Sequence, residues 1–183
     1  MHIAFALFMV MLLLTGAVPH KLVRTKVTEG VTVSLPPEFF PMTPEDITQR
    51  FPSVRAPLGA YTNQDRVVDF SVNISATQWP DANQEIAAKF FKAALLNLYD
   101  KVDLLQEGIQ TVHKKKFIFF EFESRINANR RMEGGSEPIM KYTYIQYLVE
   151  PGRTLVFTFS CPRPLREEWQ KTAHEVMKSI RVK

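Results

Sequence analysis

The stretch VDLLQEGIQTVHKKKFIFFEFESRI, residues 102–126, decides the fold, and IMKYTYIQYLVEPGRTLVFTFS, residues 139–160, completes it. Each stretch holds two runs rich in β-branched and aromatic residues, which predict strands. The runs are separated by Lys114-Lys115-Lys116 in the first stretch and by Pro151-Gly152 in the second. Consecutive strands joined by short turns pair antiparallel. We therefore expect a four-strand meander over 102–112, 117–126, 139–149 and 154–160.

A hairpin and a long helix are expected before the meander. Apolar and polar residues alternate over 66–76, which predicts an antiparallel strand with one face toward solvent. A shorter strand over 59–62 is expected to pair with it. Over 81–99 the apolar residues recur at helical spacing, and they are Ile86, Ala87, Phe90, Phe91, Ala94, Leu95 and Leu98. This stripe predicts a helix that lies on the sheet.

The two ends of the domain carry further signals. Alternation over 31–35 predicts a strand that ends at Pro36-Pro37. Thr43 suits a helix N-cap and Pro44 the first helical position, so a short helix is expected there, ending near Phe51. At the other end, 165–180 predicts a closing helix with Trp169 on its apolar side.

The order of these elements predicts an α+β fold. It consists of an antiparallel sheet of about six to seven strands, flanked by two long helices in an α/β sandwich. The chain has 183 residues, of which 45% are hydrophobic and 23% charged, values typical of globular proteins. We expect a single domain over 30–183, preceded by an N-terminal extension over 18–29. The net charge of +4 is modest and does not require an anionic polymer as partner.

The first residues predict a signal peptide. Ile3 to Val18 is an uncharged, mostly apolar run, shorter than the roughly 20 residues that a membrane-spanning helix needs. Thr15-Gly16-Ala17 supplies small residues for cleavage. We therefore expect residues 1–17 to be cleaved off, which gives a periplasmic or secreted protein. No cysteine stands there to carry a lipid, so a lipoprotein is not expected. The alternative is that the segment stays uncleaved as a single-span anchor. Basic residues after the run would then keep the domain in the cytoplasm. We expect no membrane contact other than through such an anchor.

The chain resembles the PsbP-like fold superfamily. The resemblance lies in the element order, in Gly30-Val31-Thr32-Val33-Ser34-Leu35-Pro36 and in Ser179-Ile180-Arg181-Val182 after the last helix. This superfamily includes an extrinsic subunit of photosystem II, a Ran-GTPase-binding protein and many secreted bacterial proteins. Its members mostly act by binding other proteins and share no catalytic constellation. The resemblance therefore implies a binding or accessory role with an unknown protein partner, an analogy at the level of fold.

Several side chains are candidates for chemistry. Cys161 and His174 suggest a thiol dyad, but Cys161 ends an apolar strand, which favours a structural thiol. A single cysteine excludes an internal disulfide. Glu121 and Glu123 share one strand face, and Asp65 and Asp69 flank another strand. Acidic pairs of this kind can hold Ca²⁺, and the two glutamates could also form a glycosidase pair. We interpret all four acids as parts of solvated strand faces, with Lys141 as the cross-strand partner of one glutamate.

No HxH or HExxH pattern occurs in the sequence, so we expect no metal and no cofactor. Three tyrosines on one strand, Tyr142, Tyr144 and Tyr147, are expected to be covered by helices, with an exposed partner surface as the alternative.

Basic residues gather at both ends of the predicted sheet. His113 to Lys116 and Arg153 fall at one end. The other end is richer in arginine, which binds carboxylate or phosphate in a bidentate way, and its members are Arg125, Arg130, Arg131, Arg163 and Arg166. We take this second group as the candidate anion or partner contact. No aromatic residues interleave with it, so nucleic acid is not expected.

The sequence thus favours an extracytoplasmic binding or accessory protein that is not an enzyme. The alternatives are a hydrolase with an unrecognised site and a membrane-anchored, chaperone-like adaptor.

Overall fold

The computed structural model describes residues 21–51, 55–77, 79, 83–127 and 137–183. The elements are β1 (Val23–Thr28), β2 (Val31–Leu35), β3 (Phe40–Pro41), α1 (Pro44–Arg50), β4 (Gly59–Thr62), β5 (Asp69–Ile74), α2 (Gln84–Leu98), β6 (Lys101–Val112), β7 (Lys115–Ile126), β8 (Ile139–Glu150), β9 (Arg153–Pro162), the 3-10 helix η1 (Arg163–Leu165), α3 (Arg166–Lys178) and β10 (Arg181–Val182).

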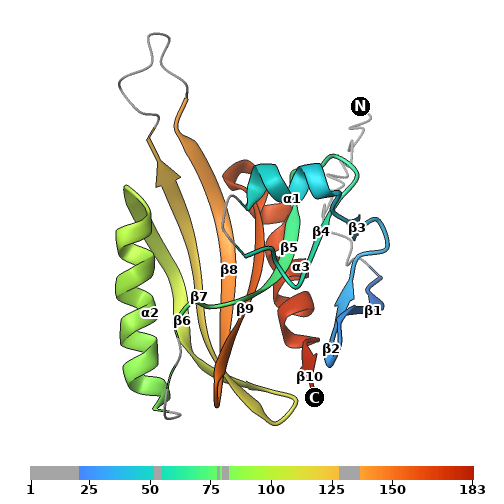
Figure 1. Cartoon of the computed structure of the whole chain (residues 1–183). Helices are drawn as coiled ribbons and strands as arrows, with labels where there is room; N and C mark the ends of the chain where they lie inside the picture. Colours follow the sequence, from blue (N-terminus) through green and yellow to red (C-terminus); the bar gives the residue numbers. More distant parts are fainter. Residues whose placement is uncertain (1–20, 52–54, 78, 80–82, 128–136) are drawn as a thin grey trace, which may run out of the picture.

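The strands form two antiparallel sheets. The larger sheet has seven strands in the order β3-β4-β5-β9-β8-β7-β6, and the smaller has three in the order β1-β2-β10 (Figure 1). The meander β6 to β9 is present as expected, and the β4–β5 hairpin joins it where β5 pairs with β9. The predicted α+β class with a large antiparallel sheet is confirmed.

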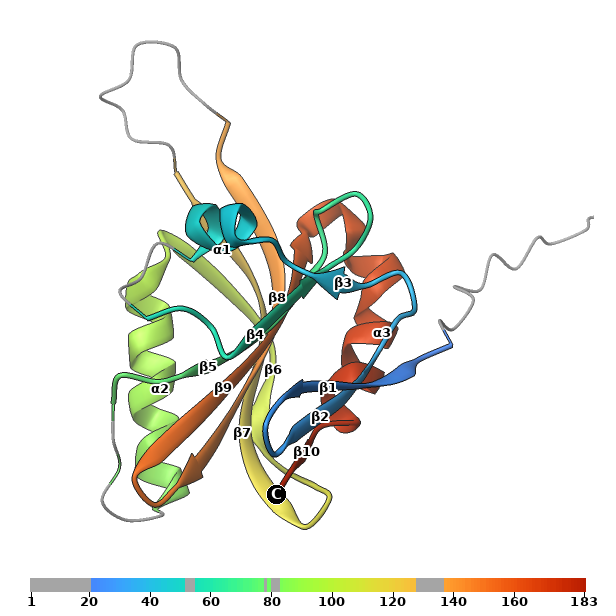
Figure 2. The same ribbon diagram turned by 45° about the vertical axis from the view of Figure 1, so that its right-hand side comes forward.

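The helices α2 and α3 cover opposite faces of the larger sheet (Figure 2). On the α2 side, Phe91 packs with Phe120 and Phe122 of β7. On the α3 side the small sheet joins the packing, so Val33, Phe157 and Val176 belong to one core. Burial of apolar surface on both faces accounts for the continuous apolar character of β7. None of the helices in the described ranges has the length and apolarity to cross a membrane.

Local sequence signals account for α1. Thr43 accepts a hydrogen bond from the backbone of Asp46, and the Asp46 side chain accepts one from the backbone of Thr43, forming a capping box. Pro44 occupies the first turn, and the helix ends at Arg50 with Phe51 as its C-cap. The expected start and end of this helix are confirmed.

Two features of the strands differ from expectation. We expected 31–35 to be the first strand, but β1 precedes it and pairs with it, so part of the predicted extension belongs to the small sheet. We also expected the polar face of the strand over 66–76 to be wet. Ser71, at its centre, is buried, and Asp69 on the same face is ion-paired with Arg50 of α1, so this face is not fully solvated.

The apolar stripe of α2 is only partly buried. Ala87, Phe91 and Leu95 face the sheet, whereas Ile86 is 56% exposed and Leu98 is 71% exposed. A helix meets a sheet along a narrow line, and the stripe is wider than that line. Apolar side chains of α2 therefore remain at the surface.

Candidate functional site

Glu121 lies at the centre of a buried hydrogen-bond network between β7, β8 and α3. Its side chain is fully buried. One carboxylate oxygen accepts hydrogen bonds from the Tyr142 hydroxyl at 2.8 Å and from Gln170 Nε2 at 2.6 Å. The other oxygen lies 3.0 Å from His174 Nε2. The prediction that Glu121 belongs to a solvated face is wrong, because α3 covers this part of β7.

The network keeps Glu121 charged. Burial alone would raise the pKa of this carboxyl, but the hydrogen bonds from His174, Gln170 and Tyr142 outweigh it and lower the pKa. Burial and the neighbouring carboxylate together raise the pKa of Tyr142 far above its usual range. Tyr142 therefore remains a hydrogen-bond donor. The network links α3 to the sheet through Gln170 and His174.

Glu123, two residues further along β7, is held by two arginines. Arg163 Nε lies 2.7 Å from one carboxylate oxygen, and Arg166 Nη1 lies 2.7 Å from the other. The predicted pairing of these glutamates with Lys141 is wrong. Lys141 stands opposite Ser124 in the register, so it projects from the other face of the sheet.

The arginines at this end border an open hollow of about 630 Å³, which we call the arginine hollow. It is lined by Glu123, Pro138, Met140, Arg163, Pro164, Arg166 and Glu167. Two acids balance two arginines in this lining. Each of these two guanidinium groups also carries N–H donors that Glu123 does not use.

The structure places the remaining predicted arginines unequally. Arg125 is exposed and stands opposite Met140 on β8. Met140 also contacts Arg163, with Nη1 3.8 Å from its sulfur, so Arg125 lies beside the arginine hollow. Arg130 and Arg131 lie outside the described residues.

The candidate thiol dyad lacks the chemistry of a nucleophile. Cys161 is buried, and burial together with the charges of Glu168 and Asp69 raises its pKa to about 12. A nucleophilic thiol requires a shift in the opposite direction. His174 uses its Nε2 for Glu121, so Cys161 is a structural thiol in this arrangement.

The acidic pair Asp65 and Asp69 does not form a cation site. Asp69 is ion-paired with Arg50 and accepts a hydrogen bond from Thr62. Across the ranges that the structure describes, no three His, Cys, Asp or Glu side chains gather closely enough to hold a metal ion.

The tyrosines of β8 divide between the two covered faces. Tyr142 and Tyr144 are buried on the α3 side, whereas Tyr147 stacks on Phe91 of α2 with ring centroids 4.1 Å apart. Coverage by helices is confirmed, and the three rings form no exposed patch.

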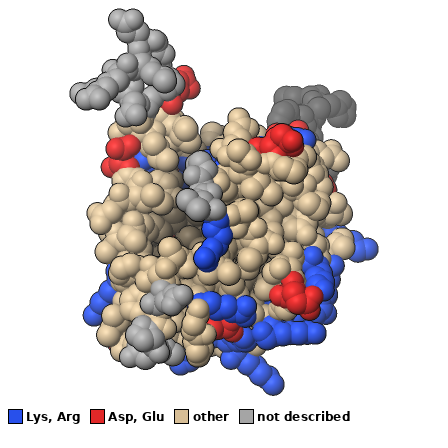
Figure 3. Space-filling view, viewed as in Figure 1, with Lys and Arg blue, Asp and Glu red and all other residues tan. Residues whose placement is uncertain are grey.

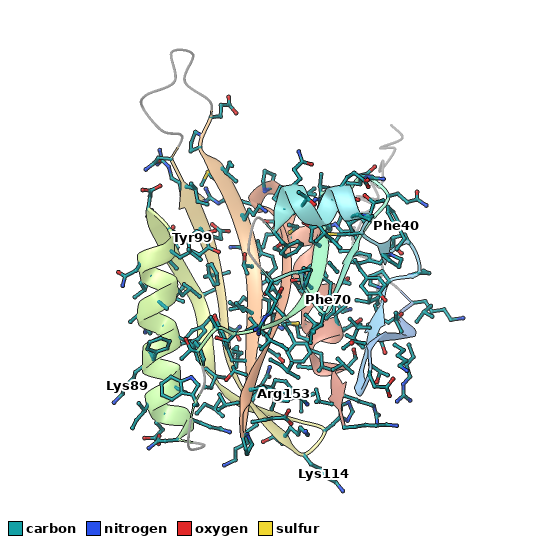
Figure 4. All side chains as sticks on the ribbon, viewed as in Figure 1. Phe40, Phe70, Lys89, Tyr99, Lys114 and Arg153 are labelled. Atoms are coloured by element: carbon teal, nitrogen blue, oxygen red, sulfur yellow. The ribbon has the colours of Figure 1, made fainter. Side chains whose placement is uncertain are left out.

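A second hollow, at the opposite end of the larger sheet, was not predicted. It encloses about 450 Å³ and is lined by Arg24, Lys26, Thr28, Glu29, Gly30, Val31, Thr32, His113, Arg181, Val182 and Lys183. We call it the basic hollow. Lys and Arg atoms are concentrated toward this end of the molecule (Figure 3), where Lys114 and Arg153 also lie (Figure 4).

The basic hollow depends on the small sheet, which brings 24–26 and 181–183 together across β2. No local motif signals that pairing. Of the residues that line this hollow, only His113, in the basic turn over 113–116, was expected from the sequence at this end of the sheet.

Comparison with known proteins supports the fold. No family model matches the chain, and no curated protein matches its sequence. Cyanobacterial PsbP (CyanoP) from Synechocystis sp. PCC 6803 superposes with a TM-score of 0.61 at 12% identity, covering 88% of this chain and 92% of that one. LpqN of Mycobacterium tuberculosis, described as involved in cell envelope biogenesis, gives 0.57 at 11% identity, covering 89% and 92%.

A mutant of Mog1 gives a TM-score of 0.52 at 12% identity, covering 88% and 95%. Mog1p of Saccharomyces cerevisiae is described as a Ran-binding protein. These likenesses show that the chain has the PsbP-like fold, and the resemblance inferred from the sequence is confirmed. At such low identity they show the fold alone.

Proposed function

We propose that this protein is a non-catalytic binding or accessory protein that acts outside the cytoplasm through contacts with another protein. The observation that carries the proposal is where its ionisable groups lie. Of the groups that suggested chemistry, Glu121, Glu123 and Asp69 are engaged in structural pairs and Cys161 is buried. Charged groups at the surface line two hollows at opposite ends of the sheet.

Proteins with this fold supply supporting analogy. Mog1p is described as Ran-binding and LpqN as involved in cell envelope biogenesis. The location outside the cytoplasm rests on the predicted signal peptide over 1–17. We also propose Arg125, Arg163 and Arg166 as a partner contact at the arginine hollow, and we keep Arg130 and Arg131, which lie outside the described residues, as candidates from the sequence.

A crosslinked pull-down tests this function. The C-terminally tagged protein is crosslinked in its native cells, and intact mass is measured on the same sample. We expect a stoichiometric partner from outside the cytoplasm and a mass lacking about 17 residues. Retention of the full leader with no partner would reject the proposal in favour of the anchored domain.

The hydrolase alternative has one observation in its favour. A buried carboxylate bonded to an imidazole, as Glu121 is to His174, is an arrangement that orients histidine in catalysis. A His174→Gln variant separates the two functions. It leaves partner capture intact if the protein is a binding protein, and it abolishes any hydrolysis found by substrate screening if His174 is a base.

A further inference from the structure

The basic hollow combines charges from distant parts of the chain on one surface. In the small sheet, Lys26 and Arg181 both stand opposite Thr32, one on each side of it. Alternation then places Arg24 on the same face as Lys26, and Lys183 on the same face as Arg181. Val31 and Val33 occupy the other face and are buried in the core. The outer face of this sheet is therefore its charged face.

Little negative charge balances these cations. Glu29 is the one acid that lines the hollow, and it lies 2.7 Å from Lys26 with 91% of its side chain exposed. Among the described residues, no acidic side chain lies within ion-pair distance of Arg24, Arg181 or Lys183. Arg24 and Arg181 thus face the solvent without an ion-paired acid, and Lys183 shares the exposed Glu29 with Lys26. Such an excess of positive charge favours an anionic partner.

The turn between β6 and β7 completes the hollow in a strained conformation. His113 and Lys114 have φ values of 46° and 69°, a region that favours glycine and asparagine. His113 lines the hollow. Strained residues persist where the surrounding structure or a function maintains them.

The shape and lining of the hollow select among anions. Its volume of about 450 Å³ accommodates a few side chains. No Phe, Tyr or Trp lines it, so it offers no platform on which a nucleobase can stack. Its cations surround a concavity and no large exposed apolar side chain stands among them, whereas binding to a bilayer favours a surface with apolar anchors.

We propose that the basic hollow binds an acidic segment of a partner protein, whose carboxylates are held by Arg24, Arg181 and Lys183. This inference rests on the proposed function, that the protein acts by binding another protein. The guanidinium groups provide bidentate contacts, and Thr28 and Thr32 add hydroxyls at the wall.

Fluorescence anisotropy with a labelled peptide of alternating glutamate and serine tests the proposal at low ionic strength. The same peptide with glutamine in place of glutamate measures binding without charge. We expect the glutamate peptide to bind at least about tenfold more tightly, and the double variant Arg24→Gln/Arg181→Gln to weaken it about tenfold, as the loss of two charge pairs predicts.

The double variant Lys101→Gln/Lys141→Gln is the matched control. It removes two positive charges from exposed residues at the opposite end of the sheet. We expect it to change peptide affinity less than about twofold, because screening weakens the effect of distant charges. Equal weakening by both double variants would mean that net charge alone attracts the peptide, and would overturn the proposal.

Vesicles of phosphatidylserine and phosphatidylcholine are the second probe. The wild-type protein could bind these vesicles and not the peptide, and the Arg24→Gln/Arg181→Gln variant could lose that binding. This result would overturn the acidic segment and make a membrane surface the ligand of the hollow. If the wild-type protein captures its crosslinked partner but not the peptide, this inference fails while the proposed function stands. Absence of any crosslinked partner would instead remove the proposed function itself.

Discussion

Glu121 and Glu123 stand two residues apart on β7 and point to the same side of the sheet, yet they perform different structural tasks. Glu121 lies under α3, where three side chains donate hydrogen bonds to it. Glu123 lies at the rim, where two arginines hold it. Strand alternation places both acids on one face of the sheet, but how far each is buried depends on where α3 crosses the sheet. Their sequence pattern alone therefore indicated a solvated pair.

Replacing Glu121 by glutamine is expected to destabilise the fold. The Glu121→Gln variant keeps the size of the side chain but loses the charge and one acceptor position, so we expect it to cost about 3 kcal/mol of unfolding free energy. Glu107→Gln is the control, because Glu107 forms an exposed pair with Lys92 and should cost less than about 1 kcal/mol. Denaturant unfolding measures both. Equal losses would show that the network adds nothing to stability.

The pH dependence of stability provides a second test of Glu121. Its pKa in the folded protein lies below the ordinary value of 4.5. The carboxylate therefore contributes stability above that value, and the contribution is lost as the pH falls through the folded pKa. We expect the difference in unfolding free energy between wild type and Glu121→Gln to be constant near neutral pH and to shrink below pH 4.5. A difference that grows on acidification would contradict this assignment.

At the scale of elements, β1 of the small sheet passes very close to β4 of the larger one. A Cβ added to Gly59 of β4 would lie 2.4 Å from Cγ1 of Val27 in β1 and 3.0 Å from the Val27 carbonyl oxygen. No side chain fits between the strands there. Glycine at this position is therefore a requirement of the contact between the two sheets.

The variant Gly59→Ala is expected to force β1 away from β4. Overpacking of this kind costs about 2 kcal/mol. In a Val27→Ala background the nearest obstacle is removed while the carbonyl remains, so the same substitution should cost about 1 kcal/mol less. A double-mutant cycle by denaturant unfolding measures the coupling. Strict additivity would mean that the two strands do not constrain each other.

The elements also show what the sequence can predict. The meander, the β4–β5 hairpin and the cap of α1 were predicted because turn residues and alternation are local signals. The small sheet was not, because β10 has only two residues and pairs with β2 across most of the chain. The stripe of α2 indicated a helix correctly, but not how much of it would remain exposed.

At the scale of the whole molecule, the two ends of the larger sheet differ in charge balance. At the arginine hollow two arginines face two acids, whereas at the basic hollow one acid faces four Lys and Arg side chains and His113. The sequence favoured the arginine end because its residues cluster along the chain. The larger excess of positive charge lies at the other end, where the fold brings together residues that are far apart in the sequence.

The arginine hollow can be tested separately from its structural role. Arg163→Gln/Arg166→Gln leaves Glu123, which is 11% exposed, without its counter-charges, so we expect a loss of about 2 kcal/mol. Adding Glu123→Gln removes the uncompensated carboxylate and should restore most of that stability. The triple variant thus carries a folded domain without the two guanidinium groups. Denaturant unfolding checks the stability, and the crosslinked pull-down checks the contact.

If these arginines touch the partner, the triple variant captures less of it than Glu123→Gln alone. If capture is equal, the arginines serve Glu123 only, and the partner contact at this end is rejected. The Arg24→Gln/Arg181→Gln variant in the same pull-down then shows whether the opposite end of the molecule faces the partner. Loss of capture in both the triple and the double variant requires a partner that reaches both ends of the sheet, because the two hollows lie at opposite ends of the long strands β6 to β9.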